Sequence, residues 1–290
     1  MGNGANRAGG SPSIPAKILA LVLSPYRFGK AVCTITGLAV ILTCTGAGLY
    51  AANFFRSLPD FHKITFDAAK ERAIRSVHKK RDDKSRKTLW CPISDISRDC
   101  IYALVTSEDA NYFEHRGVDI DSMLDSLAVN IRKRKLEYGA STISQQVVKN
   151  LFLTNEKSFI RKIKELIITE RMERAYSKNQ ILELYLNIAE TGRDLYGIRE
   201  AAQFYFRKKP AALNAAEGAF IAIMLPSPRK HQYTVFENEN IAPAKRKRIN
   251  RILRDMYTNE FISDRQYRQY AHYDYFGAKN KKRGRYVAGE

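Results

Sequence analysis

The feature that most constrains this chain is an uncharged stretch, residues 31–55, which contains no Asp, Glu, Lys or Arg. As a helix it would be about 37 Å long, enough to cross a hydrocarbon core of about 30 Å with some tilt. A buried core helix of a soluble protein is the alternative, but few such helices run this long without a charge. The sequence therefore predicts a transmembrane helix over residues 31–55.

The residues before this stretch indicate its orientation. Arg7, Lys17, Arg27 and Lys30 precede it, and no acidic residue does. Loops rich in Lys and Arg stay on the cytoplasmic side of a membrane, so residues 1–30 are expected to be a cytoplasmic segment and the remaining chain to lie across the membrane. The apolar run is too long, and starts too late, for a cleaved signal peptide.

The charge balance points to an anionic partner. The chain has 49 Lys and Arg against 30 Asp and Glu, a formal net charge of +19. Nucleic acid, acidic lipid and a phosphorylated substrate all fit such a balance. Export across a membrane disfavours nucleic acid and leaves membrane lipid or a lipid-linked substrate. Cys91 and Cys100 would both be exported, and they fit two free thiols or a disulfide equally well.

The exported part is predicted to be mainly helical, in three segments. Residues 56–88 are mixed in charge and are expected to form a stalk. Residues 89–230 show apolar side chains at helical spacing, for example at Ile181, Leu184, Tyr185 and Ile188, and residues 211–225 are typical of a buried helix. Residues 231–290 are expected to be a helical and basic extension. Strand alternation of comparable strength is absent.

The first candidate site lies in residues 107–117. Two adjacent carboxylates, Glu108 and Asp109, stand beside an aromatic pair and His115. A carboxyl group that is desolvated by apolar neighbours has a raised pKa and suits proton transfer. A solvated helix end is the alternative interpretation.

The second candidate site lies in residues 139–150, where hydroxyl and amide side chains precede Lys149. Such residues can bind a sugar attached to a phosphate. An N-capped helix with a polar face is the alternative.

The third candidate site combines several cations and one carboxylate on a predicted helical face. Lys157, Arg161, Lys164 and Glu165 have helical spacing. An ordinary ion pair between Arg161 and Glu165 is the alternative.

These clusters belong to a longer ordered pattern. It reads Glu108-Asp109 through His115-x-Gly117, Gly139-x-Ser141-Thr142-Ile143-Ser144-Gln145-Gln146, Arg161-Lys162-x-x-Glu165, Lys178-x-x-Ile181-Leu182-Glu183-x-Tyr185-Leu186-Asn187, and Gly197-x-x-x-Ala201-Ala202-x-x-Tyr205-Phe206. Over about residues 89–230 the chain resembles peptidoglycan glycosyltransferase family 51, most closely its monofunctional biosynthetic branch. The resemblance implies a lysozyme-like helical head with a smaller membrane-facing jaw, preceded by a single transmembrane helix.

The resemblance also implies a reaction. The family polymerises lipid II into β-1,4-linked glycan strands and releases undecaprenyl pyrophosphate. By similarity, Glu108 is the general base that takes the proton of the acceptor hydroxyl. Glu165 is the second catalytic carboxylate, placed near the pyrophosphate for orientation or for departure assisted by a metal, Mg²⁺ or Mn²⁺.

The remaining site residues carried over from the family are substrate-binding. Those expected to line the donor site or to stabilise the leaving group are Ser141, Thr142, Gln145, Gln146, Lys149, Asn150, Lys157, Arg161 and Lys164.

The implied location is the plasma (inner) membrane, with the catalytic domain on its outer face. The implied partners are lipid II, the growing glycan strand, anionic membrane lipid and other cell-wall synthesis proteins, with no nucleic acid. The basic run of residues 131–135 falls in the region that forms the family's jaw against the bilayer.

Two other functions remain open. A lysozyme-like cell-wall hydrolase would also use a catalytic Glu, but it has no pyrophosphate for Lys149, Arg161 and Lys164 to hold. A non-catalytic membrane scaffold would tolerate loss of Glu108 or Glu165, and both are present.

Overall fold

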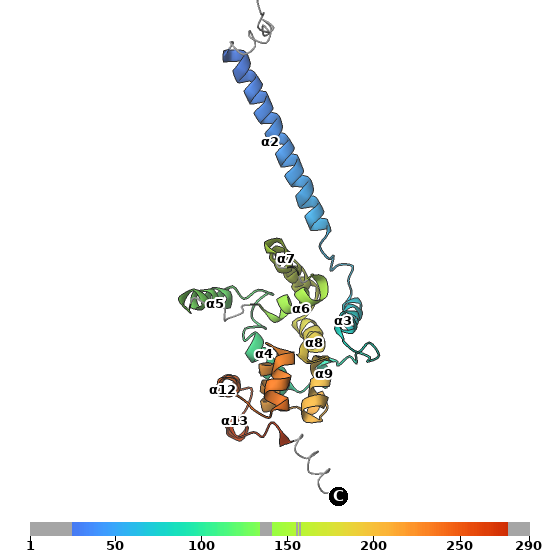
Figure 1. Ribbon diagram of the computed structural model, residues 1–290, viewed down its shortest axis with the longest axis vertical. Coiled ribbons are helices and arrows are strands. Elements are labelled where there is room, and N and C mark those ends of the chain that lie inside the picture. The colour runs from blue at the N-terminus through green and yellow to red at the C-terminus, as the bar shows by residue number, and fades with distance from the viewer. Residues whose placement is uncertain (1–24, 134–140, 155, 157, 278–290) are drawn as a thin grey trace, which may run out of the picture. The chain divides into compact units, whose positions relative to one another are not determined.

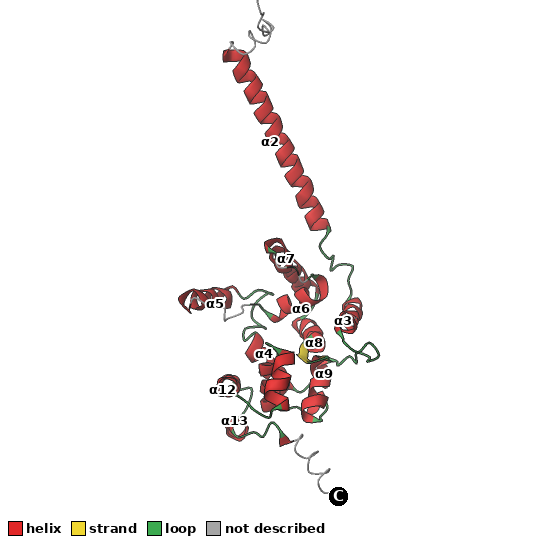
Figure 2. Cartoon of the chain, viewed as in Figure 1, coloured by secondary structure: helices red, strands yellow, loops and turns green. Residues whose placement is uncertain are grey.

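The computed structural model describes residues 25–133, 141–154, 156 and 158–277, and these residues form a mainly α fold (Figure 2). This confirms the predicted fold class. The chain divides into two compact units, one ending at Leu58 and the other beginning at Pro59.

The first unit contains helix α2, Pro25–Arg56, which includes the predicted transmembrane stretch (Figure 1). Within the part of the chain that the structure describes, it is the one helix long and apolar enough to cross a membrane. None of its residues is buried in protein. The apolar side chains of such a helix need an apolar environment outside the protein, and the hydrocarbon core of a bilayer provides one.

The second unit consists of short helices and one small hairpin. Its elements are α3 Phe66–Lys80, η1 Ile93–Asp95, α4 Arg98–Glu108, α5 Ile120–Lys133, α6 Ile143–Phe152, α7 Phe159–Ala175, α8 Lys178–Ile188, β1 Glu190–Gly192, β2 Leu195–Tyr196, α9 Gly197–Ala201, η2 Ala202–Phe206, η3 Pro210–Ala212, α10 Ala215–Met224, α11 Pro228–His231, η4 Gln232–Glu237, α12 Pro243–Thr258 and α13 Asp264–Ala271.

Helix α10 forms the centre of the core, because every one of its residues is buried. It packs against α4 and α12. A capping box begins it: the Asn214 side chain accepts from the backbone of Glu217, and the Glu217 side chain accepts from the backbone of Asn214. The buried helix predicted over residues 211–225 is thus confirmed, with a later start.

Most of the segment expected to be a stalk belongs to the second unit, which begins at Pro59. Helix α3 buries Ala69, Ala73 and Val77, one side of the helix, and packs against α8 and α6. Beyond it, the side chain of Arg81 is fully buried and forms an ion pair with Glu200 of α9. Because residues 56–88 contain many charged side chains and only a narrow apolar side, their sequence pattern does not indicate that this helix packs against the core.

The predicted C-terminal extension also contributes to the core. Helix α12 buries Ile249, Ile252, Leu253 and Met256 and packs against α10 and α4. The thiols of Cys91 and Cys100 are buried and free, so the structure has no disulfide between them.

Gly197, which follows the β1–β2 hairpin, lies very close to the backbone at the end of helix α8. This residue has φ +78°, and a Cβ atom there would lie 2.8 Å from the backbone oxygen of Asn187, at the end of α8. The Asn187 side chain in turn accepts a hydrogen bond from the backbone N–H of Cys91, at 2.8 Å. Gly197 therefore lets the hairpin pack directly on the end of α8.

We expect Gly197→Ala to destabilise the second unit by about 2 kcal/mol or more, since a side chain meets both an unfavourable backbone angle and a backbone oxygen. Thermal unfolding followed by circular dichroism measures the effect. Gly48→Ala is the control, because nothing lies within 4 Å of an added Cβ there. Equal melting temperatures for Gly197→Ala and wild type would contradict this explanation.

Candidate functional site

The candidate site is a cleft of about 380 Å³ that is lined from several helices of the second unit. Its lining comes from the ends of α3 and α4, one side of α6, the α8–β1 junction, β2, and the loop between α10 and α11. The lining residues are Lys80, Glu108, Gln146, Lys149, Asn150, Tyr185, Ile188, Ala189, Glu190, Tyr196, Leu225, Pro226 and Pro228.

Glu108 is the last residue of α4, and its side chain is 14% exposed. The Gln146 amide donates to one carboxyl oxygen at 3.3 Å, and the Arg248 guanidinium donates to the other at 3.4 Å. Burial raises the pKa of Glu108, while Arg248 and Gln146 partly oppose that rise. A carboxyl group in this state can accept a proton from a substrate hydroxyl.

Helix α6 presents Gln146, Lys149 and Asn150 to the cleft from one of its sides. The ammonium group of Lys80, from α3, donates to the side-chain oxygen of Asn150 at 2.9 Å. Burial lowers the pKa of Lys80, and the charge of Lys149 lowers it further, although Glu190 raises it. The two lysines thus bring positive charge to the same cleft as the Glu108 carboxyl.

The structure places Thr142 and Gln145 in the interior, at the start of α6. They form a capping box, in which the Thr142 hydroxyl accepts from the Gln145 backbone at 3.2 Å and the Gln145 side chain accepts from the Thr142 backbone at 3.1 Å. The Thr142 hydroxyl also donates to the Gly117 carbonyl at 2.6 Å. These contacts orient α6, and a direct contact with substrate remains a prediction. Ser141, one residue earlier, is exposed.

Glu165 lies on α7 and is not among the residues that line the cleft. Its buried carboxylate accepts from Arg161 at 2.7 Å and from Lys162, so each oxygen already faces a cation. These two cations compete with a divalent cation for the carboxylate, and a role of Glu165 as a ligand of Mg²⁺ or Mn²⁺ stays a prediction. Lys164 lies half-buried on the same helix. Lys157 lies outside the described residues.

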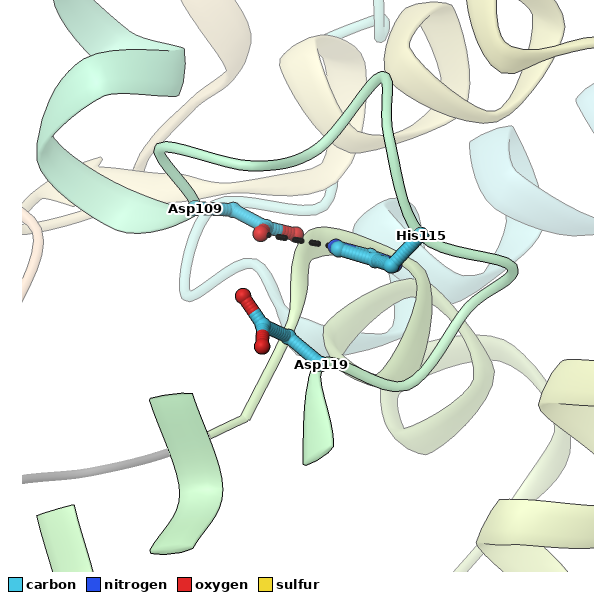
Figure 3. A group of neighbouring side chains, drawn as sticks. All are labelled: Asp109, His115 and Asp119. Atoms are coloured by element: carbon cyan, nitrogen blue, oxygen red, sulfur yellow. Dashed lines mark hydrogen bonds and ion pairs between the residues drawn. The ribbon is translucent and has the colours of Figure 1, made fainter. Parts of the chain in front are cut away.

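Asp109, which directly follows Glu108 in the sequence, forms a cluster with His115 and Asp119 (Figure 3). Their candidate ligand atoms lie within 4.8 Å of one another, which raises the question of a metal site. The His115 Nδ1 atom accepts from the Gly117 backbone at 3.1 Å, so its Nε2 carries the proton and donates to Asp109 at 2.9 Å. A protonated Nε2 has no lone pair for a metal.

The carboxylates of this cluster are also engaged. The second oxygen of Asp109 accepts from the backbone N–H of Ile143 at 2.9 Å, at the start of α6. Asp119 accepts from Asn111 at 3.0 Å and from the Ser122 backbone at 2.8 Å. The cluster therefore joins the loop after α4 to the positive end of α6 and fixes Glu108 relative to Gln146.

Sequence reasoning missed Lys80 and Arg248 as site residues. Lys80 lies within residues 56–88, the segment interpreted as a stalk, and Arg248 lies in a basic run of the C-terminal extension. Each meets its partner across a long stretch of chain: Lys80 meets Asn150, and Arg248 meets both Glu108 and, at 3.0 Å, the Ser107 hydroxyl. Local sequence patterns carry no signal for such contacts.

We expect Asp109→Asn to lower the stability of the second unit by about 1–3 kcal/mol, because an amide cannot accept both buried N–H groups. Thermal unfolding measures this loss. The control is Asp125→Asn on exposed helix α5. A metal site would instead predict that the wild type gains stability on addition of Zn²⁺ or Mn²⁺, and such a gain would overturn the structural assignment.

Most of the second unit matches a known protein family. Residues 72–257 match the family model described as Transglycosylase. The chain is 44% identical over 149 residues to the biosynthetic peptidoglycan transglycosylase of Paraburkholderia xenovorans (strain LB400), which covers 51% of this chain and 62% of that protein. It is 43% identical over 143 residues to the protein of the same name from Acinetobacter baumannii (strain SDF), covering 49% and 64%.

A third relative aligns over a longer stretch. The biosynthetic peptidoglycan transglycosylase of Aromatoleum aromaticum is 41% identical over 184 residues, covering 63% of this chain and 76% of that protein. The chain spans less than two thirds of the length of the first two relatives. The family model covers more than half of this chain and includes Glu108, Lys149 and Glu165. By this match and by its ordered motifs, the chain belongs to the transglycosylase family, peptidoglycan glycosyltransferase family 51.

Proposed function

We propose that this protein is a peptidoglycan glycosyltransferase that polymerises lipid II into β-1,4-linked glycan strands and releases undecaprenyl pyrophosphate. Family membership supports the reaction class, and the names of the relatives support the substrate. The observation that carries the proposal is the buried carboxyl of Glu108 in a cleft that also holds Lys80 and Lys149.

This combination suits glycosyl transfer to a hydroxyl group. The acceptor oxygen needs a base, which Glu108 supplies by taking its proton. The oxygen then forms a bond to the anomeric carbon of the growing strand, and the bond from that carbon to the pyrophosphate breaks. The pyrophosphate leaves with the electron pair of the broken bond, and the configuration at the anomeric carbon inverts.

The leaving group carries several negative charges, so cations accelerate its departure. Lys149 is exposed on α6, and Lys80 lies beside it. Arg161, Lys164 and, by the resemblance, Lys157 are proposed to contribute further positive charge, with Glu165 orienting Arg161. A hydrolase of the same fold would have no use for so many cations. In the structure the Glu165 carboxylate faces two cations, Arg161 and Lys162.

We further propose that α2 anchors the protein in the plasma (inner) membrane, with the N-terminus cytoplasmic and the second unit on the outer face. The apolar helix supports anchoring, and the basic residues before it support this orientation. A membrane-bound enzyme meets a lipid-linked substrate in two dimensions, which favours their encounter.

Exposed apolar side chains support contact of a jaw with the bilayer. Helix α5 exposes Ile120, Leu124 and Ile131, at 59%, 54% and 68%, and α7 begins with Phe159 at 80%. Soluble surfaces rarely expose such side chains together. Anionic lipid is the proposed partner of the adjacent basic run. Contacts with other cell-wall synthesis proteins remain a prediction.

We expect Glu108→Gln to lower the rate of glycan polymerisation by at least about 100-fold, because the amide cannot take the acceptor proton. The assay incubates detergent-purified protein with labelled lipid II and resolves the glycan by size. Glu114→Gln is the matched control, since Glu114 is exposed in the same loop and lines no part of the cleft.

Other outcomes of this assay discriminate among functions. Polymer from Glu108→Gln at the wild-type rate would place the base elsewhere. Release of soluble fragments from purified cell wall would favour a hydrolase. Lipid II binding without polymer in the wild type would favour a scaffold.

We expect Arg248→Met to shift the acidic limb of the activity profile to higher pH. The base works only when ionised, so activity falls as the pH drops through the pKa of Glu108. Arg248 stabilises the ionised form, and its loss raises that pKa further. The measurement is kcat/KM for polymerisation as a function of pH.

Two further variants test the cause of this shift. Arg248→Lys keeps a positive charge and should leave the limb closer to its wild-type position. Arg251→Met, on the exposed side of α12, should leave the limb unchanged. An unshifted limb in a folded Arg248→Met protein would contradict the role of Arg248.

A further inference from the structure

A second cavity, of about 770 Å³, lies in the second unit and shares no lining residue with the Glu108 cleft. Segment 86–95 forms one wall, and the elements from β2 to η3 form the other. Its volume is in the range of small-molecule sites, roughly 300–1,000 Å³. We call it the Arg199 cavity, after the arginine of α9 in its lining.

The floor of the Arg199 cavity is apolar. Cys91, Leu195 and Pro210 line it and are buried, and Phe204 is half-buried beside them. Burial raises the pKa of the Cys91 thiol, so this group is neutral. At the rim, the Leu89 side chain is 58% exposed. Binding of an aliphatic group against this surface would be favourable, because apolar surface on both sides would be removed from water.

The rim carries an excess of positive charge. Five of the lining residues are cationic and two, Asp95 and Glu200, are acidic. Arg86 is already paired with Asp194 and Glu200, and Lys208 with Glu217. These two cations therefore have carboxylate partners within the protein.

The other three cations do not. Among the described residues, Arg199, Arg207 and Lys209 form no ion pair with a carboxylate, although Arg199 is half-buried. The Arg199 guanidinium lies near the Cys91 thiol, which carries no compensating charge. A half-buried arginine that has no carboxylate partner can gain a charge-assisted hydrogen bond from an anionic ligand.

A second arginine, Arg207, also lines the cavity. This residue follows η2 in the left-handed conformation, with φ +56°, where glycine would be free of strain. An arginine there costs about 1–2 kcal/mol of backbone energy. The strained position brings a second guanidinium to the rim of the cavity.

We propose that the Arg199 cavity binds a phosphate ester with an aliphatic group. The guanidinium forks of Arg199 and Arg207 match phosphate oxygens, Lys209 adds a third charge, and the apolar floor takes the aliphatic part. This proposal does not rest on the proposed polymerase activity, since it concerns a separate cavity. A soluble ester and a lipid headgroup share the required chemistry.

The sole tryptophan of the chain provides a local reporter. Trp90 stands between Leu89 and Cys91, two lining residues, and its indole N–H donates to Glu183 at 2.8 Å. The experiment follows tryptophan fluorescence of the full chain in uncharged detergent at low salt. Butyl phosphate is the probe, and inorganic phosphate and 1-butanol are the comparison compounds.

We expect a saturable fluorescence change with butyl phosphate, and binding at least about tenfold weaker with inorganic phosphate. The double variant Arg199→Gln, Arg207→Gln should bind butyl phosphate at least about tenfold more weakly. Arg207→Glu is a second variant, since Arg207 is exposed and its replacement spares the interior. Arg254→Gln, on the exposed side of α12, is the control and should bind as wild type does.

Several results would overturn the proposal. No saturable change with butyl phosphate would exclude the site. If inorganic phosphate bound as tightly as butyl phosphate, the aliphatic group would make no contribution to binding. If 1-butanol gave an equal fluorescence response, the phosphate group would make none. If Arg254→Gln weakened butyl phosphate binding as much as the cavity variants do, the effect would come from the net charge of the protein and not from the cavity. Nanodiscs with and without phosphatidic acid then distinguish a lipid headgroup from a soluble ester.

Discussion

The close packing of α10 against α4 is the constraint on which the rest of the second unit depends. Gly218 of α10 makes it possible: a Cβ there would lie 2.8 Å from the Ala103 side chain and 2.9 Å from the Cys100 backbone. Small residues at this contact let the two helices approach closely. Because Glu108 is the last residue of α4, a helix fixed along its length against the core holds the carboxyl at the wall of the cleft.

The surroundings of that carboxyl combine two opposing effects. Burial disfavours its ionised form, while Arg248 and Gln146 favour it. A base needs both, because a fully solvated carboxylate is too weak and a fully buried one stays protonated. The neighbouring Asp109 acts differently, because it accepts hydrogen bonds from His115 and from the start of α6. Two adjacent carboxylates thus differ in role because one faces the cleft and the other faces a helix end.

Features set by local spacing could be predicted from the sequence. The apolar stretch, the buried helix near residue 215 and the pairing of Arg161 with Glu165 all follow from periodicity, and the motifs led to Glu108. Hydroxyl and amide side chains were ambiguous: Thr142 and Gln145 fit substrate binding and helix capping equally, and the capping box is what forms. Lys80 and Arg248 reach the site only through tertiary packing, which spacing along the chain does not record.

The position of Arg248 near the end of the folded unit has a consequence for biosynthesis. A ribosome completes all five motifs by Phe206, well before α12 is made. Until α12 emerges and docks, α10 lacks one of its packing partners and the Glu108 carboxyl lacks its cation. A nascent or truncated chain that ends before Pro243 therefore carries every motif residue but lacks the cation beside the Glu108 carboxyl. Completion of the site is thus coupled to the synthesis and docking of α12.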